Sequence, residues 1–185
     1  MHRAAKFFIE QLPKLKAVAK AIRKKINAGE IPKEELDKVA KYSVDDNTAI
    51  GYNALTDSTT GTGLLAVGSS ALANNTTGAN NSALGYGALQ NSTTASNNTA
   101  VGYLSLNDNT TGTQNTAVGA SALSTMEPAT AGDTYNTAVG FAAGQVVSTG
   151  TTNTLIGGLA GDAITTGSDN VALGYNSLSA GTASF

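Results

Sequence analysis

The heptapeptides NNTAVGY (97–103), QNTAVGA (114–120) and YNTAVGF (135–141) are almost the same phrase, repeated along one chain. Aligned on their glycine, they belong to a series of eight units that are 17 residues apart, with a single spacing of 21. A fixed period over most of a chain indicates a repeat architecture in which each unit stacks on its neighbours. The aligned glycines are Gly51, Gly68, Gly85, Gly102, Gly119, Gly140, Gly157 and Gly174.

Each unit has the same columns of residue types around its glycine. Asparagine lies four residues before the glycine except at Leu64, and an aliphatic residue lies immediately before it. Alanine precedes the aliphatic residue except at Leu155, and leucine follows the glycine by four residues except at Gly144 and Gly161. These columns predict a repeat core that includes Val67, Val101, Val118, Val139, Ile156, Gly68, Gly102, Gly119, Asn98, Asn115 and Asn136.

The residue types of the repeat predict a mostly β fold. Thr-Ala-Val favours a short strand with Thr and Val on one face and Ala on the other, whereas the Asn-Asn and Thr-Thr-Gly segments favour turns. We therefore expect a parallel β-solenoid of about eight 17-residue coils over residues 43–185, with a long turn at 124–135. The aliphatic column should form a continuous apolar spine, and the asparagine column a ladder of amides.

Small side chains leave such a coil with little to bury on its own. We expect the alanine face to pack closely against another surface, and a closed homo-oligomer would bury that face. The period itself does not fix the number of chains. Aromatic residues follow several of the glycines and are expected to pack into the coil; they are Tyr52, Tyr86, Tyr103, Phe141 and Tyr175.

Charge divides the chain into two parts. All eleven Lys and Arg residues lie between Arg3 and Lys41 together with five acids, which gives this part a net charge of +6. Residues 42–185 contain eight acids and no Lys or Arg, a composition that argues against nucleic-acid binding by the repeats. The chain has no cysteine, no apolar run of transmembrane length and no recognisable signal peptide.

Residues 1–42 are predicted to form a basic helical arm. Apolar residues recur every three or four positions, Pro13 and Gly29 interrupt the pattern, and a second helix is expected from Pro32 to about Lys41. The arm either docks on a larger assembly or caps and bundles the coils; binding to a membrane or nucleic acid is the weakest alternative. The predicted anchoring residues are Phe7, Phe8, Ile9, Leu12, Leu15, Ile22, Lys14, Lys20, Arg23 and Lys24.

The sequence gives little support to catalysis. His2 is the only histidine, and the acids of the repeats are single and scattered apart from Asp45–Asp46. A hydrolase with paired carboxylates needs two acids that converge in a cleft, a calcium site needs several oxygen ligands, and a P-loop needs a lysine after its glycines. We therefore expect no catalytic residue, no cofactor and no metal site.

The pattern NTAVGYxAL…NNTTG, which covers about Asn47–Ser179, resembles the head repeats of trimeric autotransporter adhesins. Their units carry a similar Asn-Ser-x-Ala-x-Gly core, and related repeats occur in fibres of tailed bacteriophages. The resemblance implies a homotrimeric, left-handed parallel β-roll. The 17-residue unit is longer than the usual adhesin unit, and we recognise neither the coiled-coil stalk nor the membrane barrel that such adhesins use for export.

These features favour a structural virion protein, namely a trimeric phage fibre or spike that assembles in the host cytoplasm. Its expected partners are a capsid, tail or baseplate protein, reached through the arm, and a host-surface receptor reached by the rod. One alternative is the head of a bacterial cell-surface adhesin. A second is an ice-binding β-solenoid, suggested by threonine pairs such as Thr59–Thr60 and Thr165–Thr166.

Overall fold

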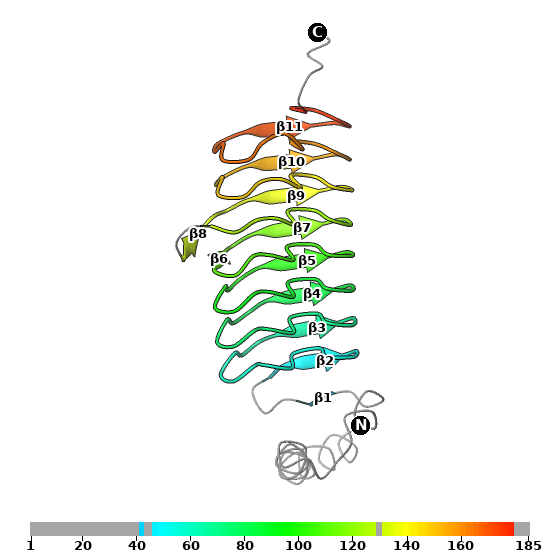
Figure 1. Cartoon of the computed structure of the whole chain (residues 1–185), viewed down its shortest axis with the longest axis vertical. Coiled ribbons are helices and arrows are strands. Elements are labelled where there is room, and N and C mark those ends of the chain that lie inside the picture. The colour runs from blue at the N-terminus through cyan, green and yellow to red at the C-terminus, as the bar shows by residue number, and fades with distance from the viewer. Residues whose placement is uncertain (1–40, 43–45, 129–130, 180–185) are drawn as a thin grey trace, which may run out of the picture.

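The computed structural model describes residues 41–42, 46–128 and 131–179. Here the chain winds into a rod of flat coils stacked along one axis (Figure 1). Eight parallel strands are joined by seven complete turns, so the prediction of a mostly β, parallel solenoid is confirmed. The three described stretches contain no α-helix, and hence no helix that is long and apolar enough to cross a membrane.

The eight parallel strands form one side of the rod. Each pairs in register with the parallel strands of its neighbouring coils, so that Ala83 lies between Ala66 and Ala100. At about 4.8 Å between neighbouring strands, the stack is about 34 Å long. The strands are β2 (Thr48–Ile50), β3 (Leu65–Val67), β4 (Ser82–Leu84), β5 (Thr99–Val101), β7 (Thr116–Val118), β9 (Thr137–Val139), β10 (Thr154–Ile156) and β11 (Val171–Leu173).

Three shorter strands lie outside this parallel stack. β1 (Lys41–Tyr42) pairs antiparallel with β2 and occupies the first edge of the sheet. β6 (Gly112–Thr113) and β8 (Gly132–Asp133) pair in parallel as a separate sheet on the flank of the rod (Figure 1). The predicted helical arm lies outside the described residues, apart from Lys41 and Tyr42, which form β1.

The alanine column points into the coil and the aliphatic column points outward, which reverses the predicted faces. Ala66, Ala83 and Ala100 are completely buried within one chain, whereas Ile50 and Leu84 are about half exposed. The prediction that alanine faces another chain is therefore wrong. Strand alternation places the two columns on opposite faces, and the space inside the coil decides which one is buried. That space is thin and is already filled by Leu55, Leu72, Leu89, Leu106 and Leu123, so only a methyl group fits beside them.

Asparagine side chains form the expected ladder inside the coil. Asn98 donates from Nδ2 to the carbonyl oxygen of Gly112 at 2.9 Å and to Oδ1 of Asn81 at 3.2 Å. Its Oδ1 accepts hydrogen bonds from the backbone N and the Nδ2 of Asn115, at 2.9 and 3.1 Å. Because these asparagines are buried, each amide satisfies polar groups of adjacent coils that water cannot reach.

The aligned glycines mark the corner that follows each strand. Gly102 has a φ of +135°, a conformation that residues with a side chain rarely adopt. A Cβ at this position would also lie 2.5 Å from the carbonyl oxygen of Gly119 in the next coil. Both the backbone conformation and the close stacking therefore require glycine in this column.

Candidate interaction surface

The outer surface of the eight parallel strands is a continuous strip of uncharged side chains, here called the strand face. It consists of the first and third residues of each strand, and none of these sixteen positions is Asp, Glu, Lys or Arg. Within one chain, the third residues are up to 75% exposed, at Leu173 of the last coil. They form an aliphatic column of Ile50, Val67, Leu84, Val101, Val118, Val139, Ile156 and Leu173.

Aromatic side chains lie just beyond the strand face, two residues after the end of a strand. Their exposure runs from 52% at Tyr52 to 78% at Tyr175, so the prediction that they pack into the coil is wrong. Tyr86 and Tyr103 of neighbouring coils stack with ring centroids 5.5 Å apart and an angle of 16° between the rings. Tyr52, Tyr86, Tyr103, Phe141 and Tyr175 are called the aromatic edge below.

The strand face and the aromatic edge leave a long apolar surface open in a single chain. Contiguous exposed apolar surface on this scale marks an interaction site in soluble proteins. Covering the exposed half of a valine or leucine side chain stabilises a complex by about 1 kcal/mol. Since the same columns recur at each coil, this contribution accumulates along the rod.

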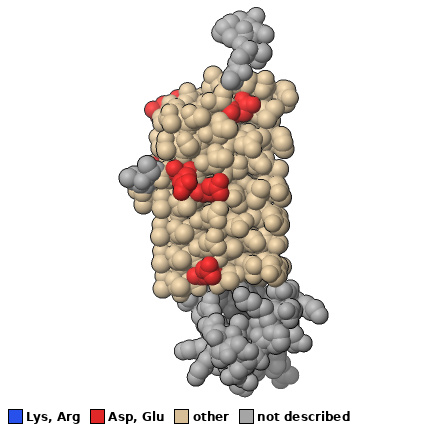
Figure 2. Space-filling model, in the orientation of Figure 1, with Lys and Arg blue, Asp and Glu red and all other residues tan. Residues whose placement is uncertain are grey.

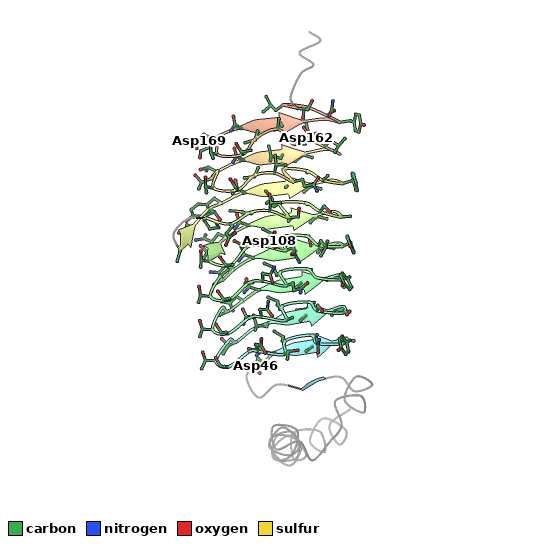
Figure 3. All side chains as sticks on the ribbon, in the orientation of Figure 1. Asp46, Asp108, Asp162 and Asp169 are labelled. Carbon is green, nitrogen blue, oxygen red and sulfur yellow. The ribbon has the colours of Figure 1, made fainter. Side chains whose placement is uncertain are left out.

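The charges of the rod do not interfere with this surface. Lys41 is the only Lys or Arg in the described stretches, and Figure 2 shows carboxylates only as separate patches on a largely uncharged surface. Asp46 and Asp108 lie at different levels of the rod, and Asp162 and Asp169 lie on different sides of it near its C-terminal end (Figure 3). Among the residues that the structure describes, no three His, Cys, Asp or Glu side chains gather into a group that could hold a metal ion.

The sequence-predicted core residues divide between the inside and the outside of the coil. Asn98, Asn115 and Asn136 are buried, and Gly68, Gly102 and Gly119 form corners between coils. Val67, Val101, Val118, Val139 and Ile156 lie on the strand face, half-buried or exposed, and do not contribute to the interior of their own chain. The predicted anchoring residues Phe7, Phe8, Ile9, Leu12, Leu15, Ile22, Lys14, Lys20, Arg23 and Lys24 all lie outside the described residues.

Two features of the coil were missed from the sequence. Leu155 is completely buried and fills the interior next to Gly144 and Gly161. In the sequence, the only signal of this arrangement was that all three residues break the repeat pattern in neighbouring units. Thr134 is buried within the 21-residue unit and shifts the register of β8. The length of the unit was the only sign of this shift in the sequence.

No protein-family model, curated protein or solved structure matches this chain.

Proposed function

We propose that this chain is a structural protein whose solenoid forms the shaft of a homotrimeric, left-handed fibre or spike. The observation that carries the proposal is the strand face, an uncharged strip whose aliphatic column runs the length of the rod. Three rods around a common axis bury their strips against one another, and each coil then meets the same coil of its neighbours. The aromatic edge of one chain packs against the strand face of the next.

A parallel arrangement of this kind also suits the charge distribution of the chain. It places the three copies of residues 1–42 at the same end of the fibre. The basic arms then dock together on a capsid, tail or baseplate protein of a virion, and their weak contacts add up through avidity. The rod projects from the particle and presents the same surface three times.

The oligomeric state of the full chain tests the proposal. Sedimentation equilibrium should give about three times the 18.5 kDa of one chain. Replacing Val101 and Val118 by Asp places charges on the strand face, and this variant should sediment as a monomer. Thr94→Asp is the matched control, because Thr94 is exposed outside the strand face, and it should remain trimeric. A wild-type chain that sediments as a monomer overturns the proposal.

The same shaft would serve the head of a bacterial cell-surface adhesin, so the location of the protein needs its own measurement. Antibodies against the solenoid, detected by electron microscopy, should label virus particles released from infected cells. Labelling of uninfected bacterial surfaces would support the adhesin alternative and contradict the virion assignment.

A further inference from the structure

The 21-residue coil changes the register of one flank of the rod. Thr113 of β6 pairs with Asp133 of β8, which is 20 residues later, whereas β7 and β9 pair with a separation of 21. The additional residue is Thr134, which is 3% exposed. Its Oγ1 donates to Oδ1 of Asn115 at 2.8 Å and lies 2.9 Å from the carbonyl oxygen of Thr113. An extra residue of this kind is a β-bulge, which re-aims the neighbouring side chains; here Asp133 lies at the surface, beside Thr113.

Four side chains at this bulge form one chain of hydrogen bonds, called the bulge cluster. Gln114 donates from Nε2 to Oη of Tyr135 at 3.2 Å, and that hydroxyl donates to Oδ2 of Asp133 at 2.8 Å. Oγ1 of Thr113 donates to the other carboxylate oxygen at 2.6 Å. The bonds from Thr113 and Tyr135 lower the pKa of Asp133, so its carboxylate is ionised and held in one orientation.

The groups that remain open in the bulge cluster are acceptors and an aromatic face. The two oxygens of the Asp133 carboxylate accept hydrogen bonds from Thr113 and Tyr135, Gln114 adds a weaker interaction, and a carboxylate has lone pairs for further donors. The Tyr135 hydroxyl already donates and accepts, but the residue is 50% exposed. An arginine guanidinium is complementary to this arrangement, because it carries only donors, pairs with carboxylates and stacks on aromatic rings.

The backbone conformation at position 135 is unfavourable for a tyrosine. Its φ is +50°, and the same column in other coils holds Asn80 and Asn97 with φ values of +56° and +60°. Asparagine tolerates this conformation well, whereas a bulky side chain does not. Leu106 also has a positive φ but is buried and recovers the cost through packing, whereas Tyr135 is exposed, as is Thr152 with a φ of +60° in the same column. Replacing Tyr135 by asparagine should therefore favour the backbone conformation of this corner.

We propose that the bulge cluster binds an arginine side chain of a partner protein. The guanidinium donates to the Asp133 carboxylate and lies on the ring of Tyr135, while Gln114 and Thr113 hold these two groups in place. The negative charge of residues 42–185 attracts a basic segment to the rod. The site lies on the flank of the rod, away from the main parallel sheet, and its function does not depend on the proposed trimer.

The test uses the full chain labelled with nitrogen-15 and the probe Nα-acetyl-arginine methylamide. Nuclear magnetic resonance signals of Asp133, Tyr135 and the Gln114 side-chain amide should shift with an affinity in the millimolar range. The citrulline analogue has nearly the same shape without the charge and should bind about tenfold more weakly. Equal binding of the two probes, or the absence of any shift, overturns the proposal.

Two variants separate binding from folding. Asp133→Asn should abolish the response to arginine, whereas Asp108→Asn, which changes another surface carboxylate, should leave it intact. Tyr135→Asn should abolish binding and at the same time raise the melting temperature, because asparagine relieves the backbone conformation. A Tyr135→Asn variant that still binds arginine, or that melts at a lower temperature than the wild type, contradicts the assignment.

Discussion

Leu155 occupies the interior space that a leucine fills, in other coils, at the position of Gly161. A Cβ added to Gly161 would lie 2.7 Å from Cδ2 of Leu155, and a Cβ added to Gly144 would lie 2.6 Å from its Cδ1. Most coils combine a strand alanine with a leucine four residues after the glycine. In the coil that contains β10, the large side chain instead comes from the strand, where Leu155 is completely buried. The interior stays filled because large and small residues exchange places between neighbouring positions.

The asparagine ladder should be the most sensitive polar element of the rod. Asn98→Ala leaves the backbone N–H of Asn115 without its buried acceptor. It also removes one hydrogen bond each from the Gly112 carbonyl and the Asn115 Nδ2, which keep Asn109 and Thr113 as partners. A buried group without a partner costs about 1–3 kcal/mol, and we expect urea unfolding to show a loss of about 2 kcal/mol or more. Asn91→Ala removes surface bonds to Asn74 and Asp108 and should cost about 1 kcal/mol or less. Equal losses in the two variants would contradict the role of the ladder.

Glycine should be essential only where the coils meet. Gly102→Ala forces a side chain into a φ of +135° and against the Gly119 carbonyl oxygen, so we expect a loss of about 3 kcal/mol or more. Gly132 lies in the same protein with no atom within 4 Å of an added Cβ. Gly132→Ala should leave the melting temperature almost unchanged, and thermal unfolding followed by circular dichroism compares the two variants directly.

The reversed strand faces lead to opposite expectations for two neighbouring residues. Ala100 is completely buried, so Ala100→Val overpacks the coil and should destabilise it by about 1–3 kcal/mol. Val101 lies on the strand face, and Val101→Ala should weaken the association of chains while leaving the fold of each coil intact. Unfolding and sedimentation measurements on both variants check this. If Ala100→Val instead weakened association alone, the alanine face would be the outer one.

The carboxyl group of Asp133 should report on the bulge cluster. Its pKa is lowered from an ordinary value of 3.8, mainly by the hydrogen bond from Thr113 and then by that from Tyr135. A lowered pKa stabilises the folded state above pH 3.8, and this contribution disappears as the pH falls through the folded-state pKa. Thr113→Val should therefore raise the pKa of Asp133 toward 3.8, and Tyr135→Phe should raise it less. Carbon-13 magnetic resonance titration of the carboxyl group measures both shifts.

The period, the strands and the asparagine ladder could be predicted from the sequence because each is written into every unit. A column such as Asn98, Asn115 and Asn136 identifies its role by repetition, and repetition also fixes the register of the strands. The direction of the strand faces could not be predicted in this way. Alternation shows that Ala100 and Val101 point to opposite sides, but the width of the interior decides which side is buried.

Relations between coils were equally hard to predict. Gly144, Gly161 and Leu155 were visible as three separate exceptions, and only their proximity shows that they compensate for one another. The long unit was recognised from its length, but the length does not tell which residue turns inward. That residue is Thr134, and its burial determines the position of Asp133 beside Thr113. The exposed aromatic edge depends on the direction in which the chain leaves each glycine corner.

The exchange between Leu155 and Gly161 can be tested as a double-mutant cycle. Leu155→Ala removes a completely buried side chain and should cost about 2–5 kcal/mol, because the thin coil cannot collapse onto the cavity. Gly161→Leu alone drives a side chain into Leu155 and should also destabilise the rod. The conformation itself is acceptable, since Gly161 has a φ of +66° and Leu106 has one of +47°.

Combining Leu155→Ala with Gly161→Leu restores the arrangement of most other coils, a strand alanine with a leucine four residues after the aligned glycine. Ile164 lies near the new side chain, but its contact is through a flexible methyl end that can shift. The double variant should therefore be more stable than either single variant, with a coupling free energy of about 1–3 kcal/mol in urea unfolding. Purely additive losses would show that Leu155 does not fill the space of a leucine at position 161. Leu106 supplies an internal control. No glycine in its coil replaces a leucine of the repeat, so no exchange of this kind should restore the stability lost in Leu106→Ala.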